Sequence, residues 1–144
     1  MSRPSSASDS KESRRSLPVR DRRRGTPLEL DGVEVQRDRD GSCLVRVRLV
    51  GGEVGEATTL DTPPGLAQAG ARAAVRAVAG SLADSERTLE LRGTKEVRAF
   101  DARIIIAAVR IRSGSQKQDL IGAVEMPGKQ VARGAAMAVL QALS

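Results

Sequence analysis

The side chains that most enzymes use for catalysis are scarce in this sequence. Its 144 residues include no His, Trp or Tyr, one Phe and one Cys. The lack of His excludes Ser-His-Asp or Cys-His catalysis and a His-ligated metal. The single thiol, Cys43, cannot form a disulfide within the chain, and we expect it to be a small buried or half-buried residue. We therefore predict that the protein is not an enzyme and that it uses no cofactor and no metal.

Arginine is the one residue type whose spacing suggests a binding site. The run RDRRR contains Arg20, Arg22, Arg23 and Arg24. The strand-like segments VRVR and VRIR contain Arg46, Arg48, Arg110 and Arg112. Guanidinium groups bind phosphate well, so these arginines are candidate contacts for an anion or a nucleic acid. The alternative is a solubilising tail together with strand arginines that pair with nearby carboxylates such as Glu53 and Glu56.

Residues 1–27 have the composition of a disordered tail. They contain seven Ser, eight Lys or Arg and three Asp or Glu, so they hold +5 of the net charge of +6. Such a segment cannot bury enough apolar surface to offset its ordering entropy. The RRS sequence resembles a basophilic kinase site, which makes Ser16 a candidate phosphorylation site. Because no apolar run reaches membrane-spanning or signal-peptide length, we expect a cytoplasmic protein without a transmembrane segment.

The remainder, 28–144, reads as one domain built from an internal repeat. LEL at 28–30 matches LEL at 89–91 with an offset of 61 residues. VRVR at 45–48 matches VRIR at 109–112, and AGARAAVRAVA at 69–79 matches RGAAMAVLQAL at 133–143, both with an offset of 64. The two halves span about 28–82 and 88–144.

Each half is predicted to form three strands followed by a helix, from its alternating apolar residues and its Gly and Pro breaks. The expected strands are 28–36, 43–50, 53–59, 88–99, 103–112 and 119–125, and the expected helices are 64–82 and 129–143. Thr62 is the expected N-cap of the first helix, and Pro63 suits its first turn. We therefore predict an α+β fold made of a duplicated βββα unit. Its six strands would form one largely antiparallel sheet with both helices on one face.

This order of elements resembles the C-terminal regulatory domain of α-isopropylmalate and citramalate synthases, the LeuA allosteric/dimerisation fold. The segments that carry the resemblance are FDARIIIAAVRIR, DLIGAVEM, the helix ending in MAVLQALS, and GEVGEATT followed by a helix. It covers about 28–144 and implies a small fold suited to pairing or to sensing a small ligand. Because the chain has no catalytic barrel, the resemblance does not extend to the synthase activity.

The strand expected at 103–112 is apolar on both faces. Ile105, Ala107, Val109 and Ile111 form the expected core face, while Ile104, Ile106 and Ala108 point the other way. A sheet covered on one side is normally polar on its open side, so we expect these three residues to be an interface. A second copy of the chain, another protein or a loop of the same chain could cover them, and a homodimer is our leading interpretation. The protein would then be a dimerising, regulatory or scaffold module with a flexible basic arm. The alternative is a nucleic-acid-binding accessory protein that uses the arm and the strand arginines.

Overall fold

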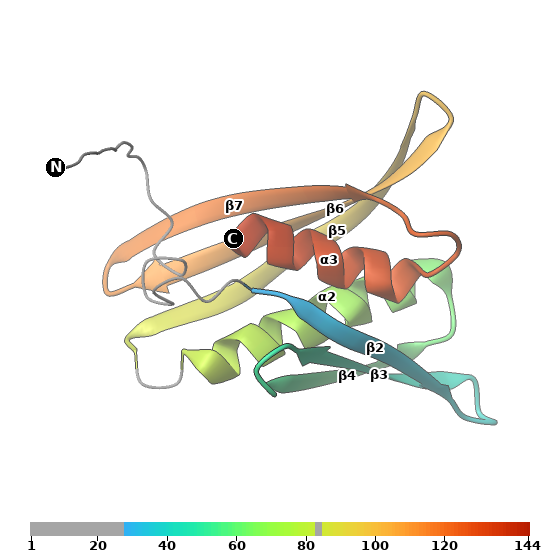
Figure 1. Cartoon of the computed structure of the whole chain (residues 1–144), viewed down its shortest axis with the longest axis horizontal. Helices are drawn as coiled ribbons and strands as arrows, with labels where there is room; N and C mark the ends of the chain where they lie inside the picture. The colour runs from blue at the N-terminus through green and yellow to red at the C-terminus, as the bar shows by residue number, and fades with distance from the viewer. Residues whose placement is uncertain (1–27, 83–84) are drawn as a thin grey trace, which may run out of the picture.

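The computed structural model describes residues 28–82 and 85–144. In chain order its elements are β2 (Leu30–Arg37), β3 (Ser42–Leu49), β4 (Val54–Leu60), α2 (Pro63–Ser81), β5 (Arg87–Ala99), β6 (Ala102–Ser113), β7 (Gln116–Glu125) and α3 (Val131–Leu143), as Figure 1 shows. The predicted α+β fold class and the repeated βββα order are confirmed. The predictions for the tail, at Ser16, Arg20, Arg22, Arg23 and Arg24, lie outside the described residues.

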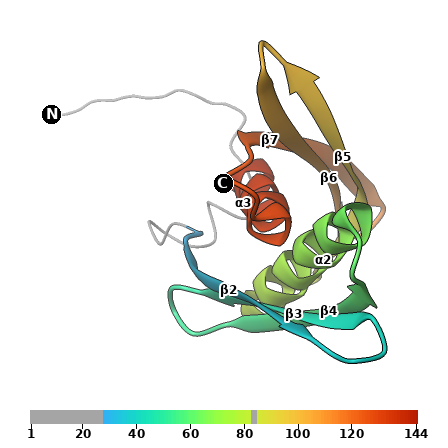
Figure 2. The ribbon, with the colours of Figure 1, turned by 90° about the vertical axis from the view of Figure 1, so that its right-hand side faces the viewer.

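The strands are arranged differently from the single sheet expected from the sequence. They form two separate three-stranded antiparallel sheets, β2-β3-β4 and β5-β6-β7. In each unit the helix packs on its own sheet, and α2 and α3 also pack against each other between the two sheets (Figure 2). The helices are rich in Ala and buried on more than one side, so each can be covered both by a sheet and by the other helix. One six-stranded sheet would leave their far sides exposed.

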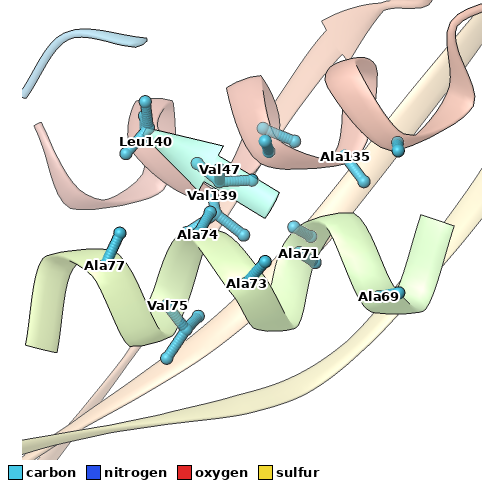
Figure 3. Close-up of a cluster of buried hydrophobic side chains, with 14 of the residues drawn as sticks. Val47, Ala69, Ala71, Ala73, Ala74, Val75, Ala77, Ala135, Val139 and Leu140 are labelled. Atoms are coloured by element: carbon cyan, nitrogen blue, oxygen red, sulfur yellow. The ribbon is translucent and has the colours of Figure 1, made fainter. Parts of the chain in front are cut away.

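The layers are held together by close approach of small residues. A Cβ atom at Gly55 of β4 would meet the backbone of Ala73 and Ala77 in α2, and one at Gly122 of β7 would meet the backbone of Ala138 and Ala142 in α3. Both glycines therefore let a helix lie directly on its strand. Figure 3 shows Ala and Val side chains of α2 and α3, together with Val47 of β3, in one buried cluster.

The core face predicted for β6 is confirmed. Ile105, Ala107 and Val109 are fully buried, and Ile111 is 3 % exposed. Cys43 of β3 is buried as expected, and its burial raises the pKa of the thiol. The N-terminus of α2 also follows the sequence, because the Thr62 hydroxyl accepts a hydrogen bond from the Gly65 N–H and Pro residues occupy the first turn.

The register of the sheets defines which positions of the two units are equivalent. Both first strands carry the same irregularity at the repeated LEL segment, between Leu30 and Gly32 and between Leu91 and Gly93. After it, Gly32 pairs with Arg48 in the first sheet, and Gly93 pairs with Ala108 in the second. The helix-contacting glycines agree, because Gly55 pairs with Val47 and Gly122 pairs with Ala107. Position 48 of β3 thus corresponds to position 108 of β6, an offset of 60.

Candidate functional site: outer faces of the two sheets

Each sheet has an inner face on the helices and an outer face directed away from them. Residues that are directly paired in antiparallel strands point to the same side of a sheet. The outer face of the first sheet therefore has three cross-strand rows: Gln36–Leu44–Thr58, Glu34–Arg46–Glu56 and Gly32–Arg48–Val54. The equivalent rows of the second sheet are Val97–Ile104–Glu125, Lys95–Ile106–Ala123 and Gly93–Ala108–Ile121. The same backbone thus presents two different surfaces.

The middle row of the first sheet's outer face is charged and largely neutralised by its own residues, while Val54 and Leu60 on the edge strand of the same face are 46 % and 67 % exposed. The Arg46 guanidinium donates a hydrogen bond to the Glu56 carboxylate at 2.6 Å and lies 3.9 Å from Glu34. The Arg48 guanidinium lies 3.9 Å from Asp31 and 3.9 Å from Glu34. This is the pairing expected if the strand arginines form a solvated face, and it includes the predicted partner Glu56. Ion pairs of this kind keep the face hydrated and contribute little to stability.

The outer face of the second sheet is apolar at the same place. Ile106 and Ala108 occupy the positions of Arg46 and Arg48, and Ile104 occupies that of Leu44. We use the term apolar patch for the following outward-facing residues of the second sheet: Val97, Ile104, Ile106, Ala108, Ile121 and Ala123. Ile121 on the edge strand is 70 % exposed, while the three β6 residues at the centre are half-buried by their neighbours. The three predicted interface residues therefore lie together at the centre of an outward-facing apolar surface.

The sequence match between VRVR and VRIR does not mark equivalent positions, and that part of the repeat alignment was wrong. Arg110 and Arg112 lie four residues further along β6 than positions 106 and 108, which correspond to Arg46 and Arg48. A shift by an even number of residues keeps the same side chains on the same face of a strand, so the sequence pattern could not reveal it. The four arginines belong to two different sheets and do not form one surface.

Arg110 and Arg112 are also held by carboxylates. The Arg110 guanidinium donates two hydrogen bonds to Asp119, at 2.7 and 3.2 Å, and its side chain is 16 % exposed. The bond from Arg110 lowers the pKa of Asp119, and the Asp119 carboxylate raises the pKa of Arg110. Arg112 lies 3.4 Å from Glu90. All four strand arginines thus have a carboxylate partner within 4.0 Å.

Opposite charges flank the apolar patch. Lys95 lies on β5, directly beside Ile106, and Glu125 lies on β7, directly beside Ile104. Both side chains are exposed, and neither has an ion-pair partner within the described residues. Sequence reasoning did not find these residues or the patch members Val97, Ile121 and Ala123, because only the cross-strand register brings them beside the β6 residues.

The hairpin formed by β5 and β6 projects beyond the end of β7 (Figure 1). Its turn places the only Phe of the chain, Phe100, at full exposure. Phe100 has a φ of 52° and Asp101 a φ of 65°, a left-handed conformation that Asn and Gly adopt more readily. The outer side of the hairpin carries the small pair Ala99 and Ala102 next to the patch.

Within residues 28–82 and 85–144, no three Cys, Asp or Glu side chains are grouped so that they could hold a metal ion. In the same part of the chain, neither helix combines the length and hydropathy needed to cross a membrane. The chain matched no protein-family model and no curated protein in the two comparisons.

Proposed function

We propose that this protein is a non-enzymatic dimerising module that pairs with a second copy of itself through the apolar patch of the second sheet. The observation that supports the proposal is the contrast between equivalent positions. Arg46 in the first sheet lies between two glutamates, whereas Ile106 in the second lies between Lys95 and Ala123. The first sheet demonstrates that this backbone accepts a charged outer face, so the fold does not require isoleucine at position 106. Contact with another surface is the remaining reason to place apolar residues there.

The second copy is the occupant because the patch is complementary to itself. It lies on one face of an antiparallel sheet, and such faces stack in aligned pairs about 10 Å apart. Its two edges carry charges of opposite sign, Lys95 and Glu125. Two-fold symmetry brings the same patch of both subunits together. An uncharged strip with one positive and one negative edge can then pair apolar residues with apolar residues and a positive edge with a negative edge.

The test is the oligomeric state of the full chain, by sedimentation velocity over a concentration series up to about 100 μM. The informative variant is Ile106→Arg combined with Ala123→Glu, which copies the Arg46–Glu56 pair of the first sheet onto the second. We expect a dimer for the original chain and a monomer for the variant, with similar circular dichroism spectra. The matched control is Thr58→Arg on the outer face of the first sheet, which should remain a dimer.

Two results would contradict the proposal. One is a chain that stays monomeric over the whole series, which would mean that the patch is covered by another partner or by residues of the same chain. The other is a dimer that the double substitution leaves intact while Thr58→Arg dissociates it, which would place the interface on the first sheet.

A further inference from the structure

We infer that the two copies pair about a two-fold axis that runs along the strands, so that Lys95 of each copy forms an ion pair with Glu125 of the partner subunit. This inference rests on the proposed dimer and specifies its orientation. The observations that carry it are the positions of the two charged residues in the sheet and the lack of ion-pair partners for them within the described residues.

The geometry follows from the register. β6 is the central strand, β5 and β7 are the edges, and the patch is centred on Ile104 and Ile106. Lys95 lies in the cross-strand row of Ile106, and Glu125 lies in the row of Ile104. These rows are two residues apart along β6, or about 7 Å, and stacked sheets lie about 10 Å apart. The Cα atoms of Lys95 and Glu125 of the partner subunit would then be about 12 Å apart, which the lysine and glutamate side chains can span together. The two charges therefore sit at opposite edges of the sheet and in adjacent rows.

Two sheets that stack face to face with two-fold symmetry have two simple orientations. If the axis runs along the strands, β6 lies on the β6 of the partner subunit and β5 lies on its β7. Lys95 then faces the edge that carries the negative charge. If the axis runs across the strands, β5 lies on β5 and β7 on β7, so that Lys95 approaches a second Lys95 and Glu125 a second Glu125.

The apolar side chains do not distinguish between these orientations, because both bury the same residues. The edge charges do distinguish them, since like charges at an interface disfavour an orientation and opposite charges favour it. Among the other charged groups on this face, Arg110 is bound to Asp119, and Arg112 and Arg92 lie beside Glu90. Lys117 lies in the row of Arg112, six residues along β6 from the row of Lys95, or about 20 Å, so that its charge is largely screened from the patch. The Glu96–Arg103 pair belongs to rows of the opposite face, because Glu96 is paired with the buried Ile105.

Engineered cysteines test the orientation directly. Cys43 is 1 % exposed and does not compete with surface thiols. Gly93→Cys and Ile121→Cys leave Lys95 and Glu125 in place, and both positions belong to the cross-strand row of Ala108 on opposite edge strands. With the axis along the strands, position 93 lies over position 121 of the partner subunit, about 10 Å away, which is too far for a direct disulfide. In the full chain, a bismaleimide reagent that spans about 10 Å should therefore join the subunits of the double variant and should join those of either single variant far less. The control is Lys117→Cys combined with Ile121→Cys, which keeps both charges, places both thiols on the same edge strand and should crosslink far less.

Charge reversal provides a second readout. Lys95→Glu and Glu125→Lys should each weaken dimerisation by about tenfold at low ionic strength, because each change affects two symmetric pairs, and the double reversal should restore it. A double cysteine variant that crosslinks no more than the single variants would overturn the inferred orientation, as would a double reversal no better than the single reversals. In both of these cases the dimer itself, and so the proposed function, would stand. A monomeric original chain would instead remove the proposed function.

Discussion

The two units of this protein differ most on their outer faces, although their inner faces follow the same plan. Inside, Gly55 and Gly122 each allow a helix to lie on its strand, at equivalent places. Outside, the row that reads Glu34–Arg46–Glu56 in the first sheet reads Lys95–Ile106–Ala123 in the second. The inner plan is fixed by helix packing, whereas the outer residues are free to differ. Their difference is therefore the best guide to what each sheet contacts.

The contrast also explains why composition is a poor guide here. The first sheet carries arginines that pair with glutamates of the same sheet, so it presents little net charge to an anion. The second sheet carries isoleucines whose significance depends on which residues flank them. A count of charged or apolar residues would not distinguish a face whose charges are neutralised by its own residues from a face with a contiguous apolar patch.

The strongest destabilisation is expected from substitutions that test whether the inner faces of the two units are equivalent. Gly55→Ala and Gly122→Ala should each destabilise the protein by about 3 kcal/mol or more, because the added methyl group would meet helix backbone that cannot move aside. Urea unfolding followed by circular dichroism measures this. Gly93→Ala is the control, since a Cβ there meets nothing within 4 Å. A small effect at one of the two glycines alone would break the equivalence of the units.

A second prediction concerns a variant whose first sheet carries the middle outer row of the second sheet. Combining Glu34→Lys, Arg46→Ile and Glu56→Ala reproduces the row Lys95–Ile106–Ala123 on the first sheet. The account predicts assemblies larger than the dimer, because each subunit would then carry two apolar faces. Light scattering coupled to size-exclusion chromatography detects them. A variant that keeps the mass of the original chain would show that an apolar row alone is not sufficient for association.

The third prediction compares the two long hairpins. The first turn uses Gly41 at a φ of 86°, whereas the second places Phe100 and Asp101 in the left-handed region. Replacing them by Asn and Gly, as Phe100→Asn with Asp101→Gly, should raise stability by about 1 kcal/mol. The measurement is the midpoint of urea unfolding. A loss of stability instead would indicate that the Phe100 side chain makes contacts that outweigh its backbone strain.

The smallest effect concerns the pair formed by Arg110 and Asp119. The pKa of Asp119 is lowered in the folded chain, so its contribution to stability is present above the pKa of the unfolded chain and is lost as the pH falls through the lowered value. Asp119→Asn should therefore slightly reduce the stability of the fold at neutral pH, and the stability of the variant should change less as the pH is lowered. Thermal melts between about pH 2 and 7 measure this. Equal acid dependence in both proteins would show that the pair is not formed in solution.

Much of the fold could be predicted from the sequence, because alternation and turn residues are local signals. The order of strands and helices, the buried face of β6 and the cap at Thr62 all follow from such patterns. The separation into two sheets could not be predicted, because it depends on how the two Ala-rich helices pack on each other. The site was predicted only in part: Ile104, Ile106 and Ala108 were found from alternation along one strand. The placement of Lys95 and Glu125 beside them depends on the register between strands, which the pattern along one strand does not reveal. The match between VRVR and VRIR, which is four residues out of register, also hid which positions of the two sheets are equivalent.

The proposed dimer depends on one surface, the apolar outer face of the second sheet, which would join two copies of the chain. The most direct measurement is sedimentation equilibrium of the full chain beside the variant that combines Ile106→Arg with Ala123→Glu. We expect a dimer for the original chain and a folded monomer for the variant, whose second sheet then resembles the first. A monomeric original chain, or a variant that dimerises as tightly as the original, would contradict this proposal.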